Sequence, residues 1–149
     1  MKIIVVSDSH GNKALLDKIA LIHQDADIFW HLGDFELPEY LIYPFSPVKG
    51  NCDYFVDCKE RKDIKINGVK FHLEHGHKLN YQYLDVIINN TNCDVFLFGH
   101  LHKKINTKIA NTFLLNPGSL TKPRDDNKGS YLVITFQNKE DLKFEFNFI

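Results

Sequence analysis

The stretch that decides the fold is Met1-Lys2-Ile3-Ile4-Val5-Val6-Ser7-Asp8-Ser9-His10-Gly11-Asn12. Its run Ile3 to Val6 is apolar and β-branched throughout, which is typical of a strand covered on both faces in the middle of an α/β sheet. Asp8 and His10 follow two positions apart, so they project to the same side of an extended segment. Open α/β sheets bind ligands beyond such strand ends. We therefore expect a ligand site here; the alternative is a polar strand end with a helix cap at Asn12.

The composition describes one ordinary domain. The chain has 149 residues, 44% of them hydrophobic, so a single domain over 1–149 with a sizeable core is expected. A formal net charge of −1, with Lys and Arg scattered, gives no support for attraction to duplex nucleic acid or an acidic membrane. No apolar run is long enough to cross a bilayer. Three cysteines without paired spacing, and no signal peptide, favour a reducing cytoplasm.

Hydrophobic periodicity predicts alternating strands and helices early in the chain and hairpins late. Asn67-Gly68 is a strong hairpin signal between two alternating segments. Besides the first strand, the predicted strands cover 27–32, 45–49, 57–66, 69–75, 94–98, 105–110, 112–116, 131–137 and 142–149, and the predicted helices cover 13–24, 35–40 and 80–90. These faces are satisfied by an α/β fold of two mixed β-sheets packed as a sandwich and flanked by helices.

Seven side chains of metal-binding types lie at or just beyond predicted strand ends. They are Asp8, His10, Asp34, Asn51, His75, His100 and His102. Carboxylate, imidazole and amide ligands suit Mn²⁺, Fe, Zn²⁺ or Ni²⁺ better than Ca²⁺. Seven ligands are too many for one transition metal but suit two ions roughly 3.5–4 Å apart that share one carboxylate. The alternative is a coincidental set of polar residues at strand ends.

Five sequence blocks, in this order, resemble those of the calcineurin-like metallophosphoesterases. They are Asp8-Ser9-His10, Gly33-Asp34, Gly50-Asn51-Cys52-Asp53, His75-Gly76-His77 and Gly99-His100-Leu101-His102. The resemblance runs from Lys2 to about Arg124 and is closest to the short, single-domain phosphodiesterase branch of that family. It implies a double β-sandwich and two divalent metal ions, with manganese expected and nickel, iron or zinc as alternatives.

The resemblance also implies roles for the seven ligand-type residues. Asp8, His10 and His102 would bind the first ion. Asp34 would bridge both ions. The second ion would be completed by Asn51, His75 and His100.

The implied activity is that of a metal-dependent phosphodiesterase, in which a metal-bridging hydroxide attacks phosphorus in line. The expected catalytic residues are Asn51, Cys52, Asp53 and His75. Asp53 is expected behind the site, orienting a His or Asn ligand through a hydrogen bond. Cys52 stands where larger family members carry a His. Because a thiol is a poorer acid than imidazolium near neutrality, substrates with good leaving groups are expected.

Other residues carry smaller expectations. His77 and Arg124 could contact the substrate phosphate. The late stretch Asn116-Pro117-Gly118-Ser119 resembles a family motif whose role the sequence leaves open. The three histidines outside the five blocks are expected at the surface or at sheet edges; they are His23, His31 and His72. For His31, which precedes the Gly33-Asp34 turn, the alternative is a residue that supports a ligand, and the sequence does not assign it.

Three rival functions stay open at this point. A non-catalytic binding scaffold of the same fold would be expected to lack ligands, and none of the seven is missing. A nuclease would need a basic groove or an aromatic platform, which the charge balance does not support. A phosphomonoesterase is not distinguished from a phosphodiesterase by the sequence. The expected partner is a small phosphate ester, with neither membrane nor nucleic acid, and an exposed carboxy-terminal edge strand could pair into a homodimer.

Overall fold

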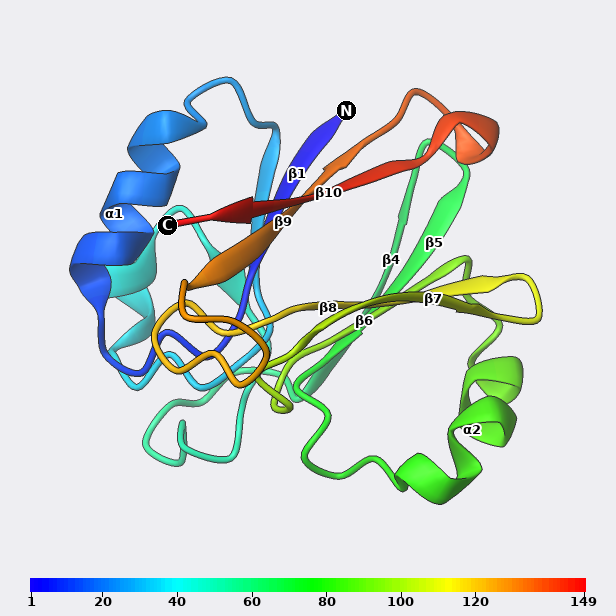
Figure 1. The fold of residues 1–149 in the computed structure, drawn as a ribbon, viewed down its shortest axis with the longest axis horizontal. Helices are drawn as coiled ribbons and strands as arrows, with labels where there is room; N and C mark the ends of the chain where they lie inside the picture. Colours follow the sequence, from blue (N-terminus) through cyan, green and yellow to red (C-terminus); the bar gives the residue numbers. More distant parts are fainter.

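Two five-stranded sheets form the body of the molecule in the computed structural model, which describes residues 1–149 (Figure 1). The first sheet contains β1 (Lys2–Val6), β2 (Ile28–His31), β3 (Ser46–Pro47), β9 (Ser130–Thr135) and β10 (Lys143–Phe148) in the order β10-β9-β1-β2-β3. The second contains β4 (Arg61–Ile66), β5 (Val69–Glu74), β6 (Val95–Phe98), β7 (Lys104–Ile109) and β8 (Thr112–Pro117) in the order β4-β5-β6-β8-β7. Both sheets mix parallel and antiparallel pairs, which confirms the predicted fold class.

Strand β1 is covered on both faces, as its unbroken apolar run predicts. Ile3 and Val5 point into the core between the sheets, where they pack with residues of β5, β6 and β9. Ile4 and Val6 point the other way and pack beneath α1 (Lys13–Ile22) through Leu16 and Ile19. Each such fully buried aliphatic side chain stabilises the fold by about 1.5–3 kcal/mol.

Helices lie on the two outer faces of the sandwich. In Figure 1, α1 lies outside the first sheet and α2 (Leu84–Thr91) lies outside the second. Ile88 of α2 packs on Phe96 and Phe98 of β6. Three short 3₁₀ turns complete the regular structure: η1 (Glu39–Ile42), η2 (Tyr81–Tyr83) and η3 (Lys139–Asp141). No helix combines the length and the apolar character that crossing a bilayer requires.

Several predicted boundaries shift. The helix expected over 35–40 is the 3₁₀ turn η1, which lies further along the chain. The helix expected over 80–90 divides into η2 and α2, because Tyr83 has a non-helical backbone at the junction (φ −115°, ψ 25°). Strand β4 begins at Arg61, four residues after the predicted start at Asp57. Strand ends that precede predicted ligands also move: β3 ends at Pro47 instead of residue 49, and β5 ends at Glu74 instead of His75.

The expectation for the histidines outside the five blocks is wrong. His23, His31 and His72 are buried, with exposed fractions of 9%, 0% and 6%. His72 lies on the polar face of β5, yet its ring packs against Phe96 at a centroid distance of 4.6 Å. That face is covered because α2 and β6 build a small apolar cluster beside it. His31 lies beneath the candidate site itself.

Candidate metal centre

Parallel pairing brings six loops to one end of the sandwich, and five of them carry ligand-type residues. Strands β1, β2 and β3 run parallel in one sheet, and β5, β6 and β8 run parallel in the other. The loops that follow them therefore meet at the same edge, as expected for open α/β sheets. They bring together all seven ligand-type side chains, which are Asp8, His10, Asp34, Asn51, His75, His100 and His102. Their role as metal ligands stays a prediction.

Asp8, His10 and His102 form what we call the first half-site. His102 Nε2 lies 3.1 Å from Asp8 Oδ1. His10 Nε2 lies 3.5 Å from His102 Nε2. Asp8 is fully buried, and its Oδ1 has no hydrogen bond of good geometry besides this close approach of His102. One atom of each of the three side chains lies within 4.8 Å of the others, which is a spacing that a single cation can fill.

Asn51, His75 and His100 form the second half-site, with Asp34 between the two halves. His75 Nε2 lies 3.3 Å from Asp34 Oδ2 and 4.0 Å from Asp8 Oδ1. Asn51 Oδ1 lies 3.2 Å from His75 Nε2. The rings of His75 and His100 are 5.1 Å apart. One ligand atom each of Asp8, Asp34 and His75 lies within 4.8 Å of the others, so Asp34 lies near both half-sites; its bridging role stays a prediction.

Hydrogen bonds fix the orientation of three of the imidazoles. The Nδ1–H groups of His75 and His102 donate to the carbonyl oxygens of Leu32 and Lys122, at 2.7 Å and 2.8 Å. His10 Nδ1–H donates to a carboxylate oxygen of Glu36 at 2.7 Å. In a neutral ring this leaves the Nε2 lone pair as an acceptor, and in all three rings it points into the site. The Nε2 lone pairs and the carboxylate oxygens that they face are all acceptors, so a cation is needed between them. The residues present therefore fit a metal centre.

The electrostatics of the site favour positive charge. The hydrogen bond and the charge of Asp8 raise the pKa of His102 against the effect of desolvation. Burial alone lowers the pKa of His75, but its hydrogen bond to Asp34 and the charges of both aspartates outweigh burial and raise it. The same two histidines lower the pKa of Asp8 despite burial, whereas His75 and the hydrogen bond from the Cys52 N–H lower that of Asp34. The carboxylates therefore favour positive charge on His75 and His102, whereas burial lowers the pKa of His100.

Strained backbone marks the same loops. Nine residues other than glycine have positive φ. Six of them lie in this site; they are Asp8, His10, Asp34, Glu36, His100 and His102. Such conformations cost about 1–3 kcal/mol each and persist where surrounding contacts over-determine them. Backbone N–H groups of Asp8 and His10 donate to the carbonyls of Gly33 and Asp34, both at 3.0 Å, so the first two loops hold each other in place.

Asp53 differs from its expected role. The prediction that it orients a His or Asn ligand is wrong: its fully buried carboxylate instead accepts three backbone N–H groups. Oδ2 accepts from Asp34 and Gly50 at 2.7 Å and 2.8 Å, and Oδ1 accepts from Glu36 at 2.8 Å. Burial raises the pKa of Asp53, which these hydrogen bonds partly offset. Asp53 therefore positions the backbone of the loop that carries Asp34, because it accepts hydrogen bonds from that loop and from its own.

Cys52 contacts the site through its backbone as well as its thiol. Its N–H donates to Asp34 Oδ1 at 2.9 Å. Its Sγ lies 3.4 Å from the amide nitrogen of Asn51. Burial, together with the negative charges of Asp34 and Glu36, raises the pKa of Cys52 to about 12. The thiol therefore stays protonated at neutral pH, which makes it a poor nucleophile and a weak acid.

Sequence reasoning left His31 unassigned, although it supports the ligand loops from behind. His31 Nδ1 accepts a hydrogen bond from the Gly33 N–H at 3.2 Å, and His31 Nε2 is hydrogen-bonded to Ser9 Oγ at 2.8 Å. Burial lowers the pKa of His31 to about 3, so it links the first two loops as a neutral ring. The closeness of His31 to the Gly33-Asp34 turn was the one signal of a role in the site, but nothing in the sequence shows that its side chain points inward.

The late stretch Asn116-Pro117-Gly118-Ser119 gains a defined place. Asn116 Nδ2 donates to the carbonyl of Gly99 at 2.7 Å, which holds the loop that carries His100. Ser119 Oγ donates to the carbonyl of Asp8 at 2.9 Å. Both side chains are fully buried. This stretch therefore supports the ligand loops rather than contributing a ligand.

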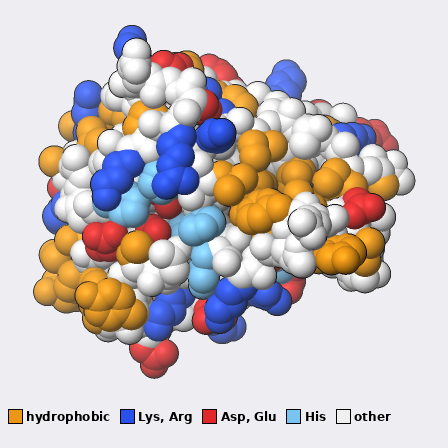
Figure 2. Space-filling view, turned by 60° about the horizontal axis from the view of Figure 1, so that its bottom comes forward, with side chains coloured by type: hydrophobic (Ala, Val, Ile, Leu, Met, Phe, Trp, Pro, Cys, Tyr) orange, Lys and Arg blue, Asp and Glu red, His pale blue; other side chains and the backbone are white.

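His77 and Arg124 lie beside the candidate site. The His77 ring is 5.4 Å from that of His75, and its Nδ1 is buried without a hydrogen-bond partner. The Arg124 N–H donates to the carbonyl of His102 at 2.9 Å. On the face shown in Figure 2, His side chains lie in a hollow with Lys, Arg and acidic side chains around it. A phosphate group arriving there would meet both charge signs.

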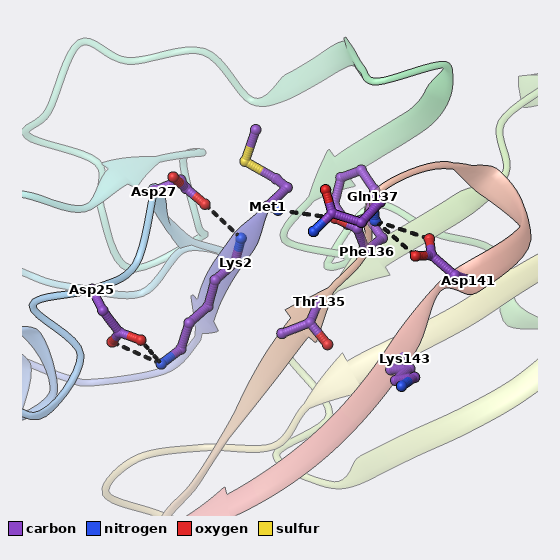
Figure 3. Close-up of a pocket in the computed structure, with 9 residues that line it drawn as sticks. All are labelled: Met1, Lys2, Asp25, Asp27, Thr135, Phe136, Gln137, Asp141 and Lys143. Carbon is purple, nitrogen blue, oxygen red and sulfur yellow. Dashed lines mark hydrogen bonds and ion pairs between the residues drawn. The ribbon is translucent and has the colours of Figure 1, made fainter.

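A separate pocket lies at the opposite end of β1 (Figure 3). Its carboxylates already have partners: Asp25 pairs with Lys2 Nζ at 2.8 Å, and Asp141 accepts the Gln137 N–H at 2.9 Å. The ligand-type residues follow the carboxyl end of β1, whereas this pocket surrounds Met1 and Lys2 at its start. We therefore assign it no part in the chemistry.

Comparisons with known proteins give consistent matches over most of the chain. A family model described as the calcineurin-like phosphoesterase superfamily domain matches residues 1–139. The probable metallophosphoesterase YsnB of Bacillus subtilis is 32% identical, over 93% of this chain and 86% of that protein. The phosphodiesterase YfcE of Escherichia coli K12 is 25% identical, over 88% of this chain and 85% of that protein. A crystal structure of a predicted phosphoesterase from Streptococcus pneumoniae TIGR4 superposes with a TM-score of 0.86 at 29% identity, covering 99% of this chain and 88% of that chain.

Proposed function

The chain belongs to the calcineurin-like phosphoesterase superfamily, and on this premise we propose that it is a phosphodiesterase that uses two divalent metal ions. The observation that carries the proposal is the convergence of three imidazole Nε2 atoms on the buried carboxylates of Asp8 and Asp34. Preference for diesters over monoesters is supported by the similarity to a protein named as a phosphodiesterase.

The ligand sets follow the two half-sites. Asp8, His10 and His102 would hold one ion and Asn51, His75 and His100 the other, with Asp34 shared. Their oxygen and nitrogen donors suit Mn²⁺ first and also Ni²⁺, Fe or Zn²⁺. When bound, two such ions generate hydroxide from water near neutral pH and offset the charge on the phosphoryl oxygens.

The protein's own groups hold the ligands and receive the substrate. Cys52 donates its N–H to Asp34, which keeps that carboxylate directed between the half-sites. His77 and Arg124 would contact the phosphate from the rim. No strong acid lies at the position of Cys52, whose pKa is raised to about 12. Diesters of acidic alcohols or phenols, which leave without a proton, are therefore the expected substrate class.

The wider setting is part of the same proposal. We expect a small phosphate ester as partner, in the cytoplasm, on the evidence of charge balance and free cysteines. Strand β10 forms the outer edge of its sheet, so a second copy could pair along it.

The test is hydrolysis by metal-free protein reloaded one ion at a time. The substrates are bis(p-nitrophenyl) phosphate and p-nitrophenyl phosphate, and the variants are Asp34→Asn and the exposed control Asp17→Asn. We expect Mn²⁺ to restore diester hydrolysis above monoester hydrolysis in the wild type and the control. Asp34→Asn should lose at least about 100-fold in activity, together with metal.

Two outcomes would contradict the proposal. If Asp34→Asn kept full activity and full metal content, Asp34 could not be the ligand that the two ions share. Wild-type protein that binds metal yet hydrolyses neither ester would favour the binding scaffold of the same fold.

A further inference from the structure

Three loops of the metal centre repeat one backbone pattern. In each, one residue has positive φ and a second follows two positions later: Asp8 and His10, Asp34 and Glu36, His100 and His102. Five of these six side chains are proposed ligands, and Glu36 is the sixth. A glutamate held at φ 53° is uncommon outside turns, so its conformation points to a constraint from its surroundings.

Two contacts supply that constraint. The Glu36 N–H donates to the buried carboxylate of Asp53 at 2.8 Å. The Glu36 Oε1 accepts the Nδ1–H of His10 at 2.7 Å. The His10 side chain is 9% exposed and that of Glu36 is 36% exposed, so the pair lies at the edge of the site with its inner end covered. Asp53 thus fixes the backbone that directs Glu36 at His10.

Among the three oriented imidazoles, His10 alone has a charged partner at its Nδ1–H. His75 and His102 donate to neutral backbone carbonyls, at 2.7 Å and 2.8 Å. A carboxylate partner fixes the ring and raises the basicity of its opposite nitrogen more than a carbonyl does. The Nε2 of His10 faces His102 in the first half-site.

We propose that Glu36 is a positioning residue for the first half-site: it holds His10 with its Nε2 toward the ion and strengthens it as a ligand. The inference rests on the proposed metal centre and adds a residue outside its seven ligands. The second half-site has no such carboxylate, so the effect should be confined to one ion.

The experiment is a Zn²⁺ titration of metal-free protein labelled with ¹⁵N in its histidine rings. Ring spectra identify which histidines each ion contacts, and calorimetry gives the affinities. The variants are Glu36→Ala, Glu36→Gln and the exposed control Glu140→Ala. Metal-free His10→Gln protein assigns the His10 signals.

One of the two ions should change the ring signals of His10 and His102. We expect Glu36→Ala to lower the affinity for that ion by about 10–100-fold. Glu36→Gln should lose less, because its amide oxygen can still accept the His10 Nδ1–H. The ion that shifts His75, and both ions of the control, should keep their affinity. In metal-free protein the His10 Nδ1–H signal should persist in the wild type and Glu36→Gln but exchange away in Glu36→Ala.

Three results would overturn the inference. Wild-type affinities in Glu36→Ala would show that the contact has no effect on metal binding. An equal loss for both ions would indicate a general structural role. Equal loss in Glu36→Ala and Glu36→Gln, with the His10 signal retained, would make Glu36 itself a ligand. Wild-type protein that binds no Zn²⁺ would refute the proposed function instead, while the metal-free signal would still test the contact.

Discussion

Replacing Asp53 by alanine should be among the most damaging substitutions in the molecule. The change removes the acceptor of three backbone N–H groups, those of Asp34, Glu36 and Gly50, at a carboxylate that is itself fully buried. Hydrogen bonds to a charged acceptor contribute about 1.5–3 kcal/mol each, so three sum to roughly 4.5–9 kcal/mol. Water entering the vacated space recovers part of this, which leaves an expected loss of about 3–6 kcal/mol. That is a large fraction of a typical unfolding free energy of roughly 5–15 kcal/mol.

Urea unfolding of the metal-free protein measures this loss. Asp53→Asn should cost about half as much as Asp53→Ala, because its amide keeps one oxygen as an acceptor and turns the other position into a donor. The exposed Asp57→Ala is the matched control and should unfold like the wild type. Metal affinity, measured separately, should fall in both Asp53 variants because Asp34 and Glu36 lose their anchor. An unfolding free energy for Asp53→Ala within about 1 kcal/mol of the wild type would refute this reasoning.

Three further outcomes are expected. Gly50→Ala should lose metal binding, measured as metal content after dialysis, because a Cβ there would overlap both the carboxylate and the backbone nitrogen of Asp34; full metal content would contradict this. His72 has its pKa raised because hydrogen bonds to Asp63 and Glu74 outweigh burial, so its stabilisation is fully present below its ordinary value of 6.5 and is lost as pH rises through the higher folded value. Urea midpoints should therefore fall more between pH 6 and pH 9 in the wild type than in His72→Gln, and equal falls would argue against it. Free Mn²⁺ at 100 times its dissociation constant should raise the unfolding free energy by about 2.7 kcal/mol, and an unchanged thermal midpoint would exclude binding to the folded state.

The strands and their polar ends could be predicted from the sequence because both are local signals. The β-branched run Ile3 to Val6 indicates a strand covered on both faces, and Asn67-Gly68 indicates a hairpin; both are present in the structure. Ligand-type residues follow strands whose parallel pairing brings their ends together, so their convergence follows from topology.

The supporting contacts could not be predicted, because they join side chains to backbone groups far along the chain. Asp53 reaches the N–H of Asp34 across 19 positions, and nothing local distinguishes that from a contact with a ring. His72 occupies a polar position in an alternating strand, yet its face of the sheet is covered by neighbours that the pattern does not specify. Glu36 is identified only by its φ and its contact with His10.

The position of bound metal tests the central claim most directly. Anomalous diffraction from crystals grown with Mn²⁺ should show two peaks per chain, roughly 3.5–4 Å apart, with Asp34 touching both. One should lie against Asp8 and the other against His75. A single peak, or two peaks that share no ligand, would contradict the two-ion centre.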